Sequence, residues 1–362
     1  MVEWKKLGDF ASVQKTKNKK HITENAYSIT QAGLVPTKSF FKEKTHVTSA
    51  DTSGYYIVQK DWFVYSPSRI DVGSISYLKD EGPVIVSPID VVFSIDKNKC
   101  LPSYLLSYFF TYDGKKEILR NREGVEGMGR RNLPFEAIKN MPIPLPSLSE
   151  QERIVGILDT FTSLIENLKT QISLRRKQYE HYRNKLLDLE GKPGVEMKTL
   201  GECSKKITSG KNKSKSSEGL YPVFGSTGII AYTDYYLYEK PLILVARVGA
   251  NAGYVHLSYG KYDVTDNTLI IELQDNINQK YIYHNLVHEG INQYAKGGGQ
   301  PLITSSVLKS IYFPLPSLQE QSRIVSILDE FEASIKNLEA QLEAREKQYE
   351  YYREKLLTFE RE

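Results

Sequence analysis

The chain has 362 residues, of which 40% are hydrophobic and 25% are charged, and its formal net charge is +4. This length suits two domains, and the composition is that of a globular protein rather than a disordered or membrane-spanning one. No apolar run is long enough to span a bilayer, the N-terminus lacks the apolar stretch of a signal peptide, and Cys100 and Cys203 are too few for a disulfide framework. We therefore expect a cytoplasmic protein with no membrane partner.

Residues 1–146 are predicted to form a mixed α/β domain. β-branched and aromatic residues bounded by turns indicate short strands, and two further stretches have helical spacing. The expected strands lie at 54–58, 62–67 and 82–88, and the expected helices lie at 103–110 and 115–120.

Basic side chains in this first domain are candidates for contact with a polyanion. A lysine-rich loop follows the opening strand, and arginines follow a Ser-Pro-Ser turn and a Gly-Met-Gly segment. Lysine suits phosphate, and arginine can also make bidentate contacts with bases. The candidates are Lys15, Lys17, Lys19, Lys20, Arg69, Arg130 and Arg131. Such runs are also common on solvated surfaces, so both interpretations stay open at this point.

A long helix is predicted over residues 147–190. Its start is marked by a Pro-Leu-Pro stop at 144–146 and by the capping-box pattern Ser-Leu-Ser-Glu at 147–150. Apolar residues then recur at alternating spacings of four and three, as in a coiled-coil heptad. The predicted seam contains Ile154, Leu158, Phe161, Ile165 and Leu168.

Residues 194–316 are predicted to form a second mixed α/β domain, which does not repeat the first in detail. Strands are expected at 242–246 and 268–271, and a helix is expected at 278–294. A second lysine-rich loop follows the opening strand, and two glycine-containing segments follow later in the domain. These segments supply the polyanion-binding candidates Lys211, Lys213, Lys215, Arg247, Asn251, Lys296 and Gln300.

The last segment, 317–362, repeats the first long helix. Residues 144–187 and 314–357 share 28 identities in 44 positions, at a constant offset of 170. The second seam contains Ile324, Leu328, Phe331, Ile335 and Leu338. Neither helix can bury its seam alone, and an antiparallel pair brings the end of the first helix close to the start of the second. The alternative is that each helix packs on an unrelated partner.

The predicted fold class is therefore α+β. Two mixed α/β domains are joined by two long antiparallel coiled-coil helices, and the whole chain has a pseudo-two-fold internal repeat.

No catalytic or metal-binding motif accompanies this architecture. The sequence has no phosphate-binding loop, no glycine-rich nucleotide fingerprint and no Asn/Asp-Pro-Pro-Tyr/Phe motif of amino-methyltransferases. His284 and His288 are four residues apart on a predicted helix and could share a metal ion, but no third ligand is evident and ordinary helix packing explains them as well. We therefore expect a binding protein with no metal and no catalytic residues.

The repeated motif resembles that of the specificity (S) subunits of type I DNA restriction–modification enzymes. The pattern Pro-Leu-Pro-x-Leu-x-Glu-Gln-x-Arg-Ile-Val is present at 144–155 and again at 314–325. Segments 221–229 and 247–253 are also similar to segments of the target-recognition domains of that family. The resemblance covers the whole chain.

This resemblance implies a non-catalytic DNA-recognition subunit. Each variable domain would be a target-recognition domain that reads one half of a split double-stranded DNA target, while the helices would set the gap and dock two methyltransferase (M) subunits. Restriction (R) subunits would join the full complex. S-adenosylmethionine, Mg²⁺ and ATP would belong to those partner subunits, and this chain would hold no cofactor. Two alternatives stay open: a coiled-coil scaffold that joins two protein-binding modules, and an enzyme with an unrecognised nuclease or methyltransferase site.

Overall fold

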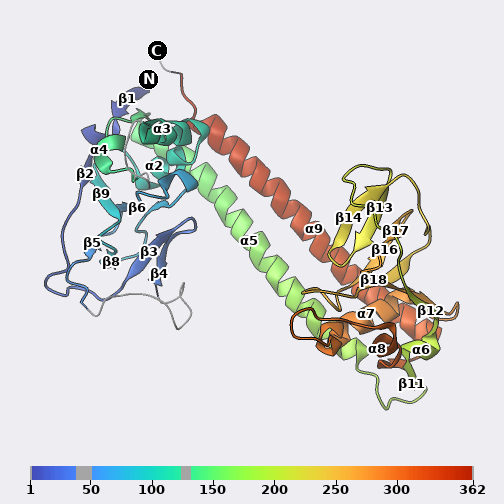
Figure 1. The fold of residues 1–362 in the computed structure, drawn as a ribbon. Helices are drawn as coiled ribbons and strands as arrows, with labels where there is room; N and C mark the ends of the chain where they lie inside the picture. The colour runs from blue at the N-terminus through green and yellow to red at the C-terminus, as the bar shows by residue number, and fades with distance from the viewer. Residues whose placement is uncertain (1, 38–50, 124–131, 361–362) are drawn as a thin grey trace. The chain divides into compact units, whose positions relative to one another are not determined.

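The structure, a computed structural model, describes residues 2–37, 51–123 and 132–360. The chain forms two compact units: unit 1 comprises residues 1–167 and 341–362, and unit 2 comprises residues 168–340. Each unit contains one mixed α/β domain and a part of each long helix (Figure 1). The two units therefore divide both helices, whereas the predicted domain boundaries at 146, 190 and 316 kept each helix whole.

Unit 1 is built on a four-stranded antiparallel sheet with the strand order β2-β9-β6-β7. Its strands are β2 (Ala11–Val13), β9 (Val91–Ile95), β6 (Phe63–Tyr65) and β7 (Ile75–Tyr77). Because side chains alternate along a strand, Phe63, Tyr65 and Phe93 join one core with the helices, while Val64 and Val92 join another beneath a smaller layer. That layer consists of β3 (Tyr27–Thr30) with β4 (Gly33–Pro36), and β5 (Tyr56–Val58) with β8 (Val84–Val86).

Unit 2 has the same plan, with the strand order β12-β18-β15-β16. Its strands are β12 (Ser204–Ser209), β18 (Thr268–Leu273), β15 (Leu242–Ala246) and β16 (Val255–Ser258). Ile243 and Val245 join the core with the helices, and Leu244 joins the core beneath β14 (Gly228–Thr233), β13 (Tyr221–Gly225) and β17 (Asp263–Val264). The four-stranded sheets of the two units thus share one strand order, whereas the smaller layers differ, so the second domain repeats the first in plan but not in detail.

The remaining elements connect these sheets to the helices. In unit 1 they are β1 (Glu3–Lys6), α2 (Pro102–Phe109), α3 (Tyr112–Glu123), α4 (Phe135–Ile138), β10 (Pro142–Leu145) and the 3-10 turns Leu7–Asp9 and Ile70–Val72. In unit 2 they are β11 (Glu196–Thr199), α6 (Leu200–Cys203), α7 (Gln279–Glu289), the 3-10 turn Ile291–Tyr294, α8 (Ser305–Lys309) and β19 (Tyr312–Leu315). The pairs β1–β10 and β11–β19 return each opening strand to the segment just before a long helix.

The helix predicted at 278–294 is shorter than expected. It ends at Glu289 because Gly290 adopts a left-handed conformation with φ of 66°, and the chain continues as a 3-10 turn.

The long helices α5 (Leu148–Leu187) and α9 (Leu318–Leu357) lie side by side and run antiparallel (Figure 1). In unit 1, Phe161 of α5 stacks on Tyr352 of α9 with ring centroids 5.3 Å apart. In unit 2, Phe331 of α9 stacks on Tyr182 of α5 at 5.4 Å. The two pairs are related by the offset of 170, with the helices exchanged. Helix pairing and the internal repeat are thus confirmed.

The ends of the predicted seam lie in the domain cores. Ile154 and Leu158 belong to the core of unit 1, which also contains Leu357 from the end of α9. Likewise, the core of unit 2 contains three residues at the corresponding positions, namely Ile324, Leu328 and Leu187. The remaining seam residues are half-buried: Ile165, Leu168, Ile335 and Leu338. Each domain core therefore includes the start of one long helix and the end of the other.

A buried glutamine fastens the start of α5 to the domain of unit 1. Gln151 donates through Nε2 to the carbonyl oxygens of Pro146 and Lys99, both at 3.0 Å, and its Oε1 accepts the N–H of Leu101 at 2.9 Å. All of these partners are backbone groups, so the side chain replaces hydrogen bonds that water would otherwise supply.

The same contact recurs in unit 2 at the start of α9. Gln321 donates to the carbonyl oxygen of Pro316 at 2.8 Å and accepts the N–H of Asn278 at 2.9 Å. The glutamine of the repeated Glu-Gln pair is thus a structural anchor in both units.

The predicted capping boxes form only in part. The hydroxyl of Ser147 accepts the N–H of Glu150 at 3.4 Å, and Ser317 accepts that of Glu320 at 3.3 Å. The carboxylate of Glu150 pairs instead with Arg153 at 2.7 Å, which holds its pKa below the usual value.

Candidate nucleic-acid interface

One edge of each four-stranded sheet carries most of the candidate residues. Neighbouring strands are antiparallel, so the end of one strand, the start of the next and the connection between them meet at the same edge. In unit 1 this edge bears the loops 14–26, 66–74 and 87–90, and in unit 2 it bears the loops 210–220, 247–254 and 265–267. We call each of these two sets of loops a loop edge.

The lysine-rich loop of unit 1 is organised by an asparagine that is fully buried. The side chain of Asn18 donates to the carbonyl oxygen of Thr23 and accepts the N–H of Ile22, both at 2.9 Å. The neighbouring Lys17 and Lys19 are exposed. The loop therefore carries its lysines on the outside of a hydrogen-bonded turn.

Unit 2 uses the same device at the same edge. Asn212 is buried, donates to the carboxylate of Asp263 at 2.7 Å, and accepts the N–H of Ser214 at 2.7 Å. Lys211 and Lys213 on either side of it are exposed. Sequence reasoning found the lysines but missed the asparagines. The recurring triplet Lys-Asn-Lys at 17–19 and 211–213 is the signal that could have found them.

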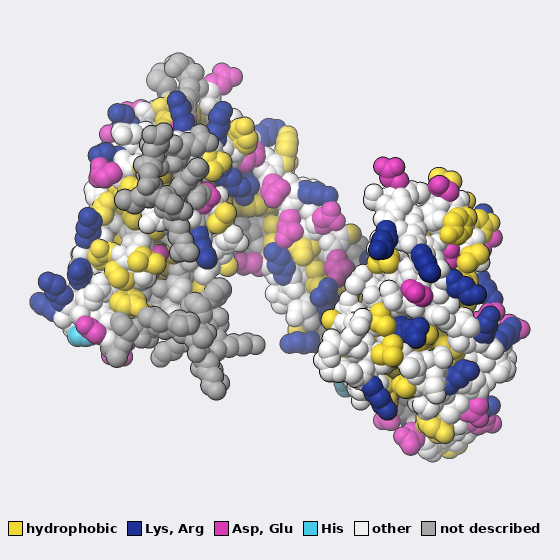
Figure 2. Space-filling model, in the orientation of Figure 1, with side chains coloured by type: hydrophobic (Ala, Val, Ile, Leu, Met, Phe, Trp, Pro, Cys, Tyr) yellow, Lys and Arg dark blue, Asp and Glu magenta, His cyan; other side chains and the backbone are white. Residues whose placement is uncertain are grey.

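The loop lysines lack the acidic partners that many other lysines have. Among the described residues, Lys60 pairs with Glu81, Lys97 with Asp61 and Lys240 with Glu272. In the same part of the chain no ion pair involves Lys15, Lys17, Lys19, Lys20, Lys211, Lys213 or Lys215. Figure 2 shows basic side chains gathered where Figure 1 draws the loop that follows β2. Exposed and unpaired cations are available to an anionic partner.

Backbone hydrogen bonds bring four further candidates of unit 2 onto adjoining loops. The carbonyl oxygen of Arg247 accepts the N–H of Ile303 at 2.8 Å, and the N–H of Gly249 donates to Pro301 at 3.0 Å. The loops 247–254 and 296–303 are thereby held together. They carry Arg247, Asn251, Lys296 and Gln300.

The arginine candidates of unit 1 are less closely grouped. Arg69 is exposed on the loop edge, where it begins the 3-10 turn Ile70–Val72. Arg130 and Arg131 lie outside the described residues.

The loop edge of unit 1 also contains a buried carboxyl group that no sequence pattern indicated. Asp90 precedes β9 and is 8% exposed, and burial raises its pKa to about 7. No hydrogen bond or ion pair of its side chain with another described residue offsets this burial. The group is therefore only partly ionised at neutral pH.

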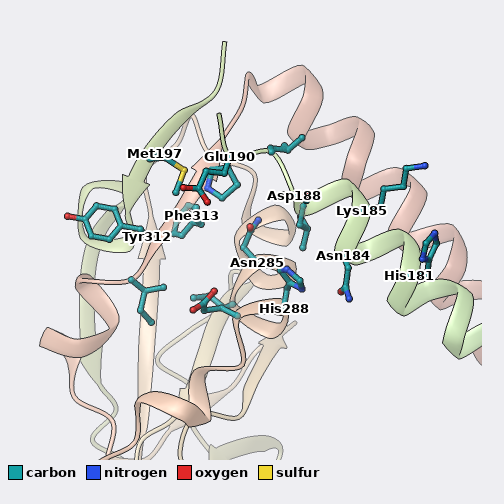
Figure 3. Close-up of a pocket in the computed structure, with 16 residues that line it drawn as sticks. His181, Asn184, Lys185, Asp188, Glu190, Met197, Asn285, His288, Tyr312 and Phe313 are labelled. Carbon is teal, nitrogen blue, oxygen red and sulfur yellow. The ribbon is translucent and has the colours of Figure 1, made fainter. Parts of the chain in front are cut away.

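A pocket of about 620 Å³ in unit 2 lies between the end of α5, α7 and the β11–β19 pair (Figure 3). His181, Asp188, His288 and Glu289 are among the residues that line it. Within the described part of the chain, no group of three or more His, Cys, Asp or Glu residues is arranged to hold a metal ion.

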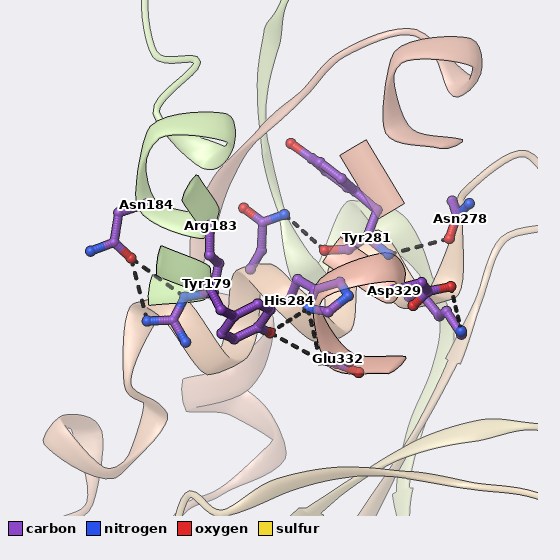
Figure 4. A network of polar contacts seen from close by, with 10 residues as sticks. Tyr179, Arg183, Asn184, Asn278, Tyr281, His284, Asp329 and Glu332 are labelled. Carbon is purple, nitrogen blue, oxygen red and sulfur yellow. Dashed lines mark hydrogen bonds and ion pairs between the residues drawn. The ribbon is translucent and has the colours of Figure 1, made fainter. Parts of the chain in front are cut away.

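His284, the other histidine of the predicted helix, lies elsewhere, buried against the long helices (Figure 4). Its Nδ1 is 3.4 Å from the hydroxyl of Tyr179 and 4.0 Å from the carboxylate of Glu332. Burial lowers its pKa to about 4, so the ring is neutral at pH 7. His284 therefore packs α7 against α5 and α9.

Neither thiol has the properties of a nucleophile. Burial raises the pKa of Cys100 to about 12 and that of Cys203 to about 11, so both remain protonated at neutral pH.

Two domains of one sheet plan, two shared long helices and a matched pair of basic loop edges define a duplicated recognition protein. The family described as the type I restriction modification DNA specificity domain matches the chain over residues 1–174 and 193–345. The chain belongs to this family of specificity subunits, and each of the two matches covers one recognition domain. The resemblance seen in the repeated motif is thereby confirmed.

Relatives and solved structures agree with this assignment. One type I restriction enzyme specificity subunit of Escherichia coli is 33% identical over 306 residues, which are 75% of this chain and 74% of that protein. Another from Escherichia coli is 31% identical over 224 residues, 56% of this chain and 55% of that protein. The crystal structure of the S subunit from M. genitalium has the same fold, with a TM-score of 0.61 and 16% identity, covering 100% of this chain and 97% of that one.

Among the helices of the described residues, none combines the length and apolarity needed to cross a membrane.

Proposed function

We propose that this chain is the DNA-reading subunit of a type I restriction–modification complex, and that each domain reads one half of a bipartite double-stranded target. The matched loop edges carry the proposal, because a buried asparagine presents unpaired lysines at the same edge of the same sheet in both domains. Lysine contacts with phosphates would supply affinity and register, and neighbouring polar side chains would supply base discrimination. One scaffold with two different loop sets suits two half-sites of different sequence.

The repeated helices support docking of two identical M subunits. In unit 2, a largely apolar groove of about 530 Å³ is lined by Tyr182, Leu186, Ile327 and Phe331, among others. The same four residue types recur 170 positions away, as Tyr352, Leu356, Ile157 and Phe161. One surface present twice, on two different domains, favours a partner that binds twice. S-adenosylmethionine, Mg²⁺ and ATP would then be held by the M and R subunits of a cytoplasmic complex.

The helices would also set the gap between the half-sites. Deleting one heptad from each of α5 and α9 should shorten the preferred gap, or abolish recognition by rotating the two domains out of phase. A variant that folds and keeps the original gap would contradict this part of the proposal.

The test of the whole proposal is a map of methylated adenines in cells that hold the M subunits, with and without this chain. We expect one split motif with a fixed gap to depend on the chain. If no motif depends on it while the chain still binds other proteins without DNA, the scaffold alternative is favoured.

A further inference from the structure

Arg247 is the only arginine between residues 193 and 319, and it lies on the loop edge of unit 2 directly after β15. Two neighbouring segments fix its backbone: its N–H donates to the carbonyl oxygen of Asn267 at 2.9 Å, and its own carbonyl oxygen accepts the N–H of Ile303 at 2.8 Å. The backbone of Arg247, from which the side chain extends, is therefore held by hydrogen bonds to both neighbouring segments.

The guanidinium group of Arg247 has no partner within unit 2, all of which the structure describes. Its Nε is inaccessible to solvent and donates to no acceptor in residues 168–340. The residue is half-buried and, in the same range, forms no ion pair, so its Nη groups supply donors at the surface. A buried donor without an acceptor is unfavourable, which points to an acceptor supplied from outside the chain.

The loop that adjoins Arg247 presents further free donors. Val248 forms a bridge with Leu302, and the N–H of Gly249 donates to the carbonyl oxygen of Pro301. The segment that begins at Arg247 is thus paired with the segment that follows the glycine run 297–299. Within residues 168–340, the N–H groups of Gly298 and Gly299 donate to no acceptor.

Nothing inside unit 2 requires glycine at these two positions. A Cβ atom at Gly298 or Gly299 would meet no atom within 4 Å, and neither residue has a left-handed φ. Glycine lowers stability through the entropy of the unfolded chain, so its presence here suits the close approach of a partner to the backbone.

We propose that Arg247 and the Gly297–Gly299 loop together bind one phosphate of the DNA backbone. This proposal rests on the proposed function and names the chemical group that this part of the loop edge holds. The guanidinium group of Arg247 and the N–H groups of Gly298 and Gly299 are donors, which is what a phosphate requires. Because Nε is buried, the guanidinium group remains close to the protein surface. It can therefore contact a phosphate of the DNA backbone, but it does not extend into a DNA groove to contact a base.

The experiment measures DNA binding by the full chain with M subunits, using target duplexes that each carry one neutral methylphosphonate in place of a phosphate. The wild type should lose affinity at one particular position within the half-site of unit 2. Arg247→Ala should weaken binding to the unmodified duplex about 10- to 100-fold and should no longer respond to the modification at that position. Arg247→Lys should retain part of the response, because it keeps the charge.

Three variants separate this role from a structural one. Lys240→Ala removes a charge just before β15, at the opposite edge of the sheet, and should keep the wild-type profile. Gly298→Ala and Gly299→Ala should leave the melting temperature unchanged or slightly raised, yet lose the response at the same phosphate as Arg247→Ala.

Two results would overturn the proposed phosphate site and leave the proposed function standing. One is an altered base preference in Arg247→Ala, which would make Arg247 a base reader. The other is a response of Arg247→Ala to the methylphosphonate duplexes that is identical to the response of the wild type. If the wild-type complex showed no preference for any DNA sequence, the proposed function would fail, and the proposed phosphate site would fail with it.

Discussion

The two units attach to the long helices through one shared set of contacts and one set that differs. In both units a tyrosine donates to the proline before a long helix: Tyr104 to the carbonyl oxygen of Pro144 at 2.8 Å, and Tyr281 to that of Pro314 at 2.7 Å. The buried glutamines Gln151 and Gln321 belong to the same shared set. These contacts use helix-flanking positions that are identical in the two repeats.

The contacts that differ use positions where the repeats differ. In unit 2 the hydroxyl of Tyr179 on α5, which lies 3.4 Å from Nδ1 of His284 on α7, donates to Glu332 on α9 at 2.9 Å. The counterpart of Glu332 in the other repeat is Thr162. In unit 1 the N–H of Tyr112 donates to Glu354 at 3.0 Å, and the counterpart of Glu354 is Asn184. Residues that are identical in the two repeats therefore make the contacts common to both units. Several residues that differ between the repeats make contacts that are specific to one unit.

The largest expected effect tests the shared set. Gln151→Ala and Gln321→Ala should each lower the free energy of unfolding by about 2–4 kcal/mol, because each leaves buried backbone groups without a partner. Urea denaturation would measure the loss, and Gln171→Ala on the exposed face of α5 is the control. A large effect in one unit and none in the other would refute the idea of one shared anchor.

A second effect follows from buried histidines, which differ between the units. Burial lowers the pKa of His256 and of His284 in unit 2 to about 4, from an ordinary value of 6.5. The unfolded chain takes up these protons at a higher pH than the folded chain, so stability is full above pH 6.5 and is lost as the pH falls toward 4. At pH 5 the loss should reach at most about 2 kcal/mol for each histidine.

Unit 1 should respond in the opposite direction. Burial raises the pKa of Asp90 from 3.8 to about 7, so its folded form holds a proton that the unfolded form releases, and stability is lost as the pH rises from about 4 to 7. Urea denaturation at pH 5 and pH 7 measures these effects. Between pH 7 and pH 5, the free energy of unfolding should fall less for His284→Gln than for the wild type. In Asp90→Asn, the loss of stability that Asp90 causes as the pH rises should be absent. The exposed His181→Gln is the control; an equal effect of His181→Gln would refute the assignment.

The sequence predicted the parts whose residues repeat at a constant offset, and it missed features that depend on tertiary structure. The offset of 170 and the heptad seam were enough to infer the antiparallel helix pair, since Phe161 and Tyr182 each have an identical counterpart. The common sheet order was not visible, because a strand requires only alternation of apolar residues and many sequences satisfy it. The partial burial of Arg247 and the burial of Asp90 depend on loops brought together by tertiary contacts, which no local pattern encodes.

A smaller effect tests the contacts that differ. Glu332→Thr introduces the residue of the other repeat and removes the acceptor of Tyr179, which should weaken the attachment of α7 by about 1 kcal/mol. Hydrogen exchange should become faster in peptides of α7 and stay unchanged in those of α2. Glu330→Thr is the matched control. Like Glu332, Glu330 is a glutamate whose counterpart in the other repeat, Thr160, is a threonine, and Glu330 is exposed. Equal exchange in the two variants would mean that the mismatch at 332 does not fasten the domain.

The smallest effect tests whether the loop edges are equivalent. Lys19→Ala and Lys213→Ala remove matched lysines beside Asn18 and Asn212, and each should weaken DNA binding about 2- to 5-fold for every sequence, with the salt dependence reduced by about one ion. Lys97→Ala, whose side chain is already paired with Asp61 at 2.8 Å, should have no such effect. Because the same triplet stands at the same edge of the same sheet, the two loop variants should agree within error. If only one of the two variants bound DNA more weakly, only one unit would contact the DNA backbone through this loop.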